Sequence, residues 1–166
     1  MAHYAIVVDL DRCIGCHGCE IACKNENNIA LGEYWNKVVE RGPFGEYPDL
    51  EMYFLPTMCQ QCQDAPCVNV CPTGASYRDA DGMVLVDKEK CTLCAHLSKN
   101  GELPMCVRTC SAGARFYGDI DDPSSDASKA LAAADPASIH TLQDVGNHPA
   151  THYILSPKRA AWKEGE

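Results

Sequence analysis

Twelve cysteines in three groups of four are the residues of this chain that could do chemistry. The first group has the spacing Cys-x2-Cys-x2-Cys-x3-Cys and consists of Cys13, Cys16, Cys19 and Cys23. Bacterial ferredoxins bind iron–sulfur clusters with this spacing, because three thiolates hold one cluster and the fourth reaches another. Gly15 lies between the first two thiols, where a residue without a side chain lets the backbone curl closely around a cluster. The spacing therefore predicts cluster binding.

The other two groups repeat this arrangement. The second has the spacing Cys-x2-Cys-x4-Cys-x3-Cys-Pro and consists of Cys59, Cys62, Cys67 and Cys71. The third has a Cys-x2-Cys pair and a later Cys-x3-Cys pair, and it consists of Cys91, Cys94, Cys106 and Cys110. We expect all twelve to bind metal and none to be catalytic. The repetition predicts an α+β fold: a loop-rich, ferredoxin-like cluster module with pseudo-two-fold repeats, short hairpins and short helices.

Disulfides and structural zinc are the alternatives to clusters. An even number of cysteines permits disulfides, but repeated Cys-x2-Cys pairs are typical of metal sites. Structural zinc sites usually show two separated pairs, whereas Cys13, Cys16 and Cys19 fall within one short loop. The spacing favours clusters, and a zinc-binding module stays open as an alternative of another class.

Length and charge limit the possible organisation and partners. The chain has 166 residues, so we expect a cluster domain at 1–118 and a cysteine-free extension at 119–166 that packs on the core or on a partner. The formal net charge of −9 argues against nucleic acid, because no basic excess is present to neutralise phosphates. No apolar stretch approaches the roughly 20 residues of a spanning helix, so we expect no membrane insertion. The first residues lack a signal-peptide pattern, so we expect a cytoplasmic protein unless a signal-bearing partner exports the folded complex.

Local patterns predict where the secondary structure lies. Strands are expected at 4–9, 51–55, 115–118 and 151–155, and a hairpin at 76–78 and 83–86 around the turn signal Asp81-Gly82. Helices are expected at 20–28, at the start of 95–105, and at 128–134 with a cap at Ser125 or Asp126. Residues 32–48 hold several glycines and prolines and are expected to form a loop.

Some other side chains have two open interpretations. Five basic residues near cysteines in the sequence could raise cluster potentials or be ordinary solvated charges: Lys24, Lys88, Lys90, Arg108 and Arg115. Three aromatic residues could anchor a partner or cover the cluster core: Tyr34, Trp35 and Phe44. His96 follows Cys94 closely, and we expect a structural role for it rather than metal binding.

These motifs, in this order, resemble the iron–sulfur electron-transfer (beta) subunit of the dimethyl sulfoxide reductase family of molybdenum oxidoreductases. The resemblance covers most of the chain and includes the cysteine groups, Asp81-Gly82-Met83-Val84, Asp122-Pro123-Ser124-Ser125 and Thr151-His152-Tyr153. Family members usually carry four cysteine groups, and the one expected between Val86 and Cys91 is missing here. The chain is thus similar to a shortened, three-cluster form. The small subunit of pyrogallol–phloroglucinol transhydroxylase resembles it in having three clusters, although its shortening differs.

The resemblance implies a non-catalytic subunit with three 4Fe-4S clusters, working in anaerobic respiration. It would pass single electrons to or from a large catalytic subunit that binds bis-molybdopterin guanine dinucleotide, with a membrane anchor or a soluble electron donor as a further partner. In the family the first and last groups exchange their final cysteines. One cluster would then take Cys13, Cys16, Cys19 and Cys110, and another Cys91, Cys94, Cys106 and Cys23.

The missing group leaves the middle site without its usual fourth ligand. We expect Cys71 to close the site of Cys59, Cys62 and Cys67. A three-iron cluster, a non-cysteine ligand or an absent cluster are the other outcomes. A subunit of a formate dehydrogenase or hydrogenase complex and a free polyferredoxin stay open as alternative functions.

Overall fold

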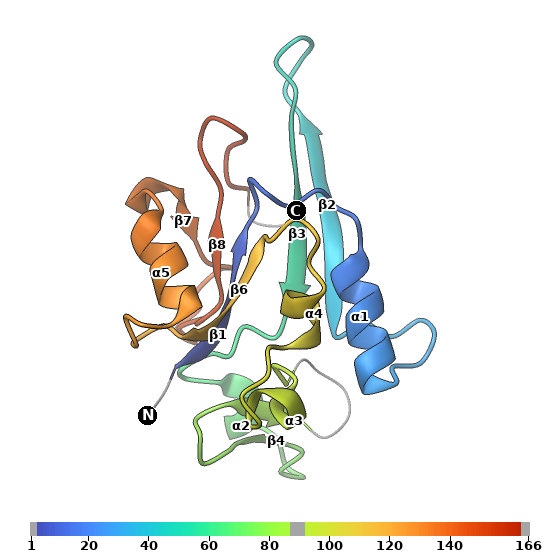
Figure 1. The fold of residues 1–166 in the computed structure, drawn as a ribbon, viewed down its shortest axis with the longest axis vertical. Helices are drawn as coiled ribbons and strands as arrows, with labels where there is room; N and C mark the ends of the chain where they lie inside the picture. The colour runs from blue at the N-terminus through green and yellow to red at the C-terminus, as the bar shows by residue number, and fades with distance from the viewer. Residues whose placement is uncertain (1–2, 87–91, 164–166) are drawn as a thin grey trace.

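A four-stranded sheet brings together distant segments of the chain (Figure 1). The computed structural model describes residues 3–86 and 92–163. In the sheet, β1 (Tyr4–Asp9) pairs antiparallel with β6 (Arg115–Asp119) and parallel with β8 (His152–Ile154). The short strand β7 (Ile139–His140) pairs with the other side of β8. Cysteine-free residues near the end of the sequence are therefore part of the same sheet as the strand that leads into the first cysteines.

Two hairpins complete the strands. The longer one joins β2 (Asn36–Phe44) to β3 (Glu51–Met58) and extends beyond the rest of the molecule (Figure 1). The shorter one joins β4 (Ser76–Arg78) to β5 (Val84–Val86) across the predicted Asp81-Gly82 turn, which confirms that prediction.

The prediction of a loop at 32–48 was wrong for the segment that forms β2. Asn36 and Val38 are buried while Lys37 is exposed, and this alternation is what a half-buried strand requires. Gly42-Pro43, which suggested a loop, falls where the hairpin register shifts between Arg41 and Phe44. Proline is tolerated at such an irregularity because fewer ladder hydrogen bonds are needed there.

The helices are short, apart from α1 and α5. They are α1 (Gly18–Asn27), α2 (Pro66–Asn69), α3 (Ala95–Ser98), α4 (Met105–Arg108) and α5 (Asp126–Ala133), with a 3-10 turn at Pro136–Ser138. Ser125 caps α5 as predicted, since its Oγ accepts a hydrogen bond from the Ser128 N–H at 3.0 Å. The expected strands at 4–9 and 151–155, which correspond to β1 and β8, and the expected helix after the first cysteines are also confirmed. In the described parts of the chain, every helix is too short or too polar to cross a bilayer.

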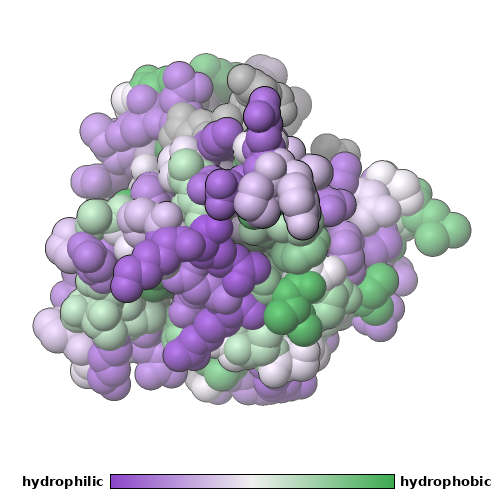
Figure 2. All heavy atoms as spheres, turned by 90° about the horizontal axis from the view of Figure 1, so that it is seen from above, coloured by the Kyte–Doolittle hydropathy of each residue, from purple (hydrophilic) through white to green (hydrophobic). Residues whose placement is uncertain are grey.

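One apolar core joins the sheet to the long hairpin. Its fully buried residues include Ile6, Val8, Leu10, Tyr53, Leu55, Tyr153 and Leu155. Viewed from above, the surface shows small hydrophobic areas separated by hydrophilic ones (Figure 2). Tyr47 and Leu50, between the two strands of the long hairpin, are 90% and 54% exposed.

Candidate metal centres

Four cysteines from two distant segments line one cavity. Cys13, Cys16 and Cys19 come from the loop and first turn between β1 and α1, and Cys110 comes from the turn after α4. These are the four thiols that the family resemblance assigns to one cluster. The sequence spacing alone does not bring Cys110 to the first group, but α4 packs against α1 and β6 continues the chain beside β1.

The long hairpin covers this first cavity. A Cβ atom at Gly15, where φ is +64°, would lie 2.5 Å from ring atoms of Phe54 in β3. Glu20 of α1 is buried, and its carboxylate accepts a hydrogen bond from the backbone N–H of Val38 in β2. The cysteine loop and the hairpin are therefore in direct contact, and a side chain at Gly15 would separate them.

A second cavity contains cysteines from the first and third groups. It is lined by Cys23, Cys94 and Cys106, together with Asn27, Asn36 and Trp35. Cys91, the expected fourth ligand, lies outside the described residues. Of the three aromatic residues considered above, Trp35 and Phe44 pack against the core, whereas Tyr34 is half exposed.

The middle group receives hydrogen bonds from amide side chains. Asn147 Nδ2 donates to Cys62 Sγ at 3.0 Å, and Gln61 Nε2 donates to Cys59 Sγ at 3.7 Å. The Asn147 loop lies directly against this group, because the Gln63 N–H donates to the His148 carbonyl at 2.9 Å. Donors of this kind stabilise negative charge on sulfur and raise cluster potentials.

Cys71 has a different environment from the buried thiols. Its Sγ lies 3.5 Å from Thr73 Oγ1. The hydrogen bond with the Thr73 side chain, assisted by the backbone N–H groups of Ser76, Thr73 and Ala75, lowers the pKa of Cys71 to about 6. The thiol is therefore largely ionised at neutral pH, as a metal ligand must be.

Burial has the opposite effect on thiols of the other two sites. It raises the pKa of Cys13, Cys94 and Cys106, and together with the neighbouring thiols it raises the pKa of Cys23 to about 12. Such thiols stay protonated at neutral pH unless a bound metal centre replaces their protons. Loading of these sites is thus coupled to proton release.

The described cysteines fit iron–sulfur clusters. All eleven are free thiols, so the disulfide alternative is wrong for them. Within residues 3–86 and 92–163, no three His, Cys, Asp or Glu side chains are placed to hold a single metal ion. The Asn36 Nδ2 group is a buried donor with no hydrogen-bond acceptor among the described residues, and Asn36 lines the second cavity. Cluster and cysteine sulfurs accept such hydrogen bonds.

The basic residues separate into two classes. Arg115 is 5% exposed and lines the first cavity. In contrast, Arg108 is exposed and pairs with Glu102 at 3.0 Å, and Lys24 Nζ donates to nearby backbone carbonyls. Lys88 and Lys90 lie outside the described residues.

His96 contacts a carboxylate rather than a thiol. Its Nε2 lies 2.7 Å from Glu26 Oε1, in an exposed pair that joins α3 to α1. The expected structural role agrees with this contact.

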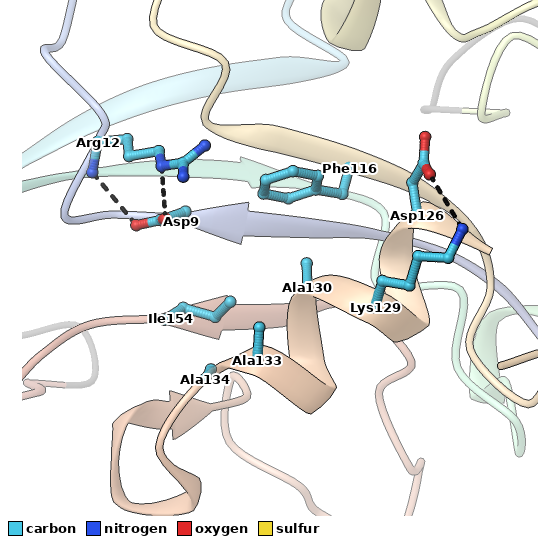
Figure 3. Close-up of a pocket in the computed structure, with 9 residues that line it drawn as sticks. All are labelled: Asp9, Arg12, Phe116, Asp126, Lys129, Ala130, Ala133, Ala134 and Ile154. Atoms are coloured by element: carbon cyan, nitrogen blue, oxygen red, sulfur yellow. Dashed lines mark hydrogen bonds and ion pairs between the residues drawn. The ribbon is translucent and has the colours of Figure 1, made fainter. Parts of the chain in front are cut away.

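A separate hollow lies between α5 and the sheet (Figure 3). Its charged side chains pair with each other: Arg12 Nε lies 3.2 Å from Asp9 Oδ2, and Lys129 Nζ lies 4.0 Å from Asp126 Oδ1. The rest of its lining is Phe116, Ile154 and three alanines of α5 and its end, without a thiol. This hollow is therefore distinct from the cysteine sites.

The amide donors around the cysteines were not predicted from the sequence. Asn27 follows Cys23 by one helical turn, and its Nδ2 lies 3.7 Å from Cys23 Sγ, so the i,i+4 spacing could have indicated it. Asn147 is 85 positions from Cys62, and no local pattern connects them.

Known proteins with similar sequences identify the family. A family model described as a 4Fe-4S dicluster domain matches residues 50–90. A Halobacterium salinarum protein named as an iron–sulfur subunit of dimethyl sulfoxide reductase is 36% identical, and the match covers 98% of this chain and 84% of the relative. The chain belongs to the iron–sulfur electron-transfer subunits of the dimethyl sulfoxide reductase family.

Other members of this family are also similar. A sulfite dehydrogenase subunit from Allochromatium vinosum is 33% identical over 96% of this chain and 85% of its own length. The arsenate respiratory reductase iron–sulfur subunit from a Shewanella species is 28% identical over 91% of this chain and 95% of its own length. The alignment with the halobacterial member spans 222 positions, more than the 166 residues of this chain, so that member holds residues that this chain lacks. The chain is accordingly an electron-transfer subunit, and catalysis in such complexes lies in other subunits.

Proposed function

We propose that the chain carries three 4Fe-4S clusters and passes single electrons between a large molybdopterin-containing subunit and a further redox partner. The observation that supports this best is the first cavity, which Cys110 shares with Cys13, Cys16 and Cys19. Four thiols around one cavity are what a cubane cluster requires, and an exchange of final cysteines between groups is the ferredoxin arrangement. A related pseudo-two-fold symmetry between the first and third groups is part of the same proposal.

The proposed ligand sets follow the two cavities and the remaining group. The first cluster takes Cys13, Cys16, Cys19 and Cys110. The second takes Cys23, Cys91, Cys94 and Cys106. The middle one takes Cys59, Cys62, Cys67 and Cys71. For the middle cluster, the ionised Cys71 thiol supports a local fourth ligand, because it needs no further deprotonation before it binds iron.

When bound, such a cluster accepts and returns one electron. The protein residues hold it, exclude water and donate hydrogen bonds to sulfur. The Ala114 N–H donates to Cys110 Sγ at 3.3 Å, and Asn147 Nδ2 donates to Cys62. The apolar cover of Val38 and Pro56 over the first cavity limits solvent there. These contacts stabilise the reduced state of a cluster and so influence which cluster holds the transferred electron.

The reaction served by the complex depends on its partner. The relatives are named for dimethyl sulfoxide, sulfite and arsenate chemistry, so we propose that the chain serves an anaerobic oxidoreductase complex of this kind. We also propose that residues 119–166 act as an extension that packs on the cluster domain, since β8 lies beside β1 and Asn147 contacts Cys62.

Anaerobic purification with metal analysis tests the proposal. Three clusters predict about 12 iron and 12 sulfide per chain, with a brown absorption band and electron paramagnetic resonance (EPR) signals on reduction, whereas two clusters predict about eight of each. The Cys110→Ser variant should lose about a third of the iron, together with the signal of the first cluster. A colourless protein that contains zinc would refute the proposal.

The partner is tested separately. Tagged chain expressed from its native host under anaerobic conditions should co-purify with a larger molybdopterin-containing chain. Recovery of a fully loaded chain with no bound partner would favour a free polyferredoxin instead.

A further inference from the structure

A buried guanidinium lines the first cysteine cavity and contacts a residue that lines the second. Arg115 is the first residue of β6 and directly follows Ala114, whose N–H donates to Cys110. It is 5% exposed and lines the first cavity with Cys13 and Cys110. Burying a charged side chain this deeply costs folding free energy unless nearby groups compensate for the lost hydration.

The end of the long hairpin holds this guanidinium in place. Arg115 Nη1 and Nη2 donate to Asn36 Oδ1 at 3.4 and 3.5 Å, and Nη2 also lies 2.9 Å from Met58 Sδ. Asn36 begins β2 and Met58 ends β3, and the two residues are paired in the hairpin register. The position of Arg115 is therefore fixed by the same hairpin that covers the cysteine loop.

Asn36 connects this contact with the second cavity. It is 2% exposed and lines that cavity with Cys23, Cys94 and Cys106. Its Oδ1 is used by Arg115, while its Nδ2 has no acceptor among the described residues. The Asn36 side chain thus accepts hydrogen bonds from the guanidinium through Oδ1, and its Nδ2 donor remains available at the second cavity.

We propose that Arg115 and Asn36 form a polar link that sets the reduction potentials of both clusters. Arg115 acts on the two clusters through its charge, and Asn36 donates Nδ2–H to a sulfur of the second cluster only. Both are positioning residues rather than ligands, and the inference rests on the proposed cluster occupancy.

The geometry carries this charge to both sites. Arg115 lines the first cavity beside Cys13, and its guanidinium donates to Asn36, which lines the second cavity with Cys23 and Cys106. A reduced cluster is more negative than an oxidised one, so a nearby fixed positive charge favours reduction.

Redox titration followed by EPR spectroscopy tests the link. Arg115→Gln removes the charge and should lower both potentials, with a change of about tenfold in each reduction equilibrium, or ~59 mV for one electron. Arg115→Lys keeps the charge and should restore most of the shift. Arg108→Gln is the matched control, because Arg108 is likewise an arginine close to the third cysteine group in the sequence, but it is exposed and paired with Glu102. It should leave both potentials close to wild type.

Asn36→Leu tests the hydrogen bond of Asn36 separately from the charge of Arg115. This test stays informative even if the Arg115 variant does not fold. Asn36→Leu should lower the potential of the second cluster and change that of the first by much less, because Met58 still contacts the Arg115 guanidinium. Equal shifts at both clusters, or none, would overturn the inference. Unchanged potentials in fully loaded Arg115→Gln would also overturn it while leaving the cluster proposal intact, whereas absence of clusters from the wild-type chain would defeat the proposed function itself.

Discussion

Replacement of Gly15 by alanine should separate the first cysteine loop from the hairpin that covers it. The residue has φ of +64°, and its added Cβ would lie 2.5 Å from the Phe54 ring. A left-handed backbone costs a residue with a side chain about 1–2 kcal/mol. Forcing an extra carbon into a packed contact adds about 1–3 kcal/mol. The expected destabilisation of the loaded protein is therefore about 2–5 kcal/mol.

Gly32→Ala is the control for the backbone contribution. Gly32 also has a positive φ, of +87°, but nothing lies within 4 Å of the point that its Cβ atom would occupy. Gly32→Ala should lower the free energy of unfolding only by the cost of placing a side chain on a left-handed backbone. The steric part should disappear when Phe54→Ala is combined with Gly15→Ala, since the smaller side chain leaves room for the new methyl group.

The two variants are compared by the rate at which their cluster absorbance bleaches in denaturant under anaerobic conditions. This rate reports the difference in their stability. A steric cost of 1 kcal/mol corresponds to about a fivefold faster loss, so Gly15→Ala should bleach at least about fivefold faster than Gly32→Ala. EPR spectroscopy should show that the first cluster is lost before the others. Equal bleaching rates for the two alanine variants would refute the packing argument.

Three further predictions concern the middle group and the short hairpin. Cys71→Ser should remove about four iron atoms per chain or convert one cluster to a three-iron form, seen by iron analysis and EPR; an unchanged cluster would mean that another ligand closes the site. Asn147→Leu removes the 3.0 Å donor to Cys62 and should lower the potential of the middle cluster alone, as measured by redox titration. Burial raises the pKa of Asp79, but hydrogen bonds from Lys99 and from backbone N–H groups outweigh this, so the net pKa is lowered. A lowered folded-state pKa stabilises the protein above the ordinary carboxyl pKa of about 4, and this stability is lost as the pH falls through the folded-state value. Asp79→Asn should therefore speed backbone hydrogen exchange in the β4–β5 turn at neutral pH. The exchange rate of the variant should also change less than that of the wild type as the pH is lowered. Identical exchange profiles for the two proteins would contradict this.

The cysteine spacing predicted the nature of the sites because it is a local property. Convergence of three thiols within one short loop follows from chain geometry, and so does the short hairpin around Asp81-Gly82. The β2 strand was missed because glycine and proline were read as loop signals. In the structure they lie at a register shift that the rest of the hairpin tolerates.

Long-range contacts could not be predicted in the same way. The placement of Cys110 beside the first group came from family resemblance, and the residue types alone carry no signal for it. Whether Arg115 or Arg108 is buried depends on where β6 and α4 pack, since both are arginines close to cysteines. The donor from Asn147 to Cys62 requires the loop before β8 to fold back on the second group.

The order of strands in the central sheet has a consequence for biosynthesis. The first cysteines leave the ribosome early, directly after β1, but β1 gains its neighbours only when β6 and then β8 have been translated. Until then the nascent chain exposes unpaired thiols and an apolar strand. We therefore expect delivery of iron and sulfide to follow translation of β8, and a scaffold that shields the unfinished polypeptide should increase the yield of mature protein.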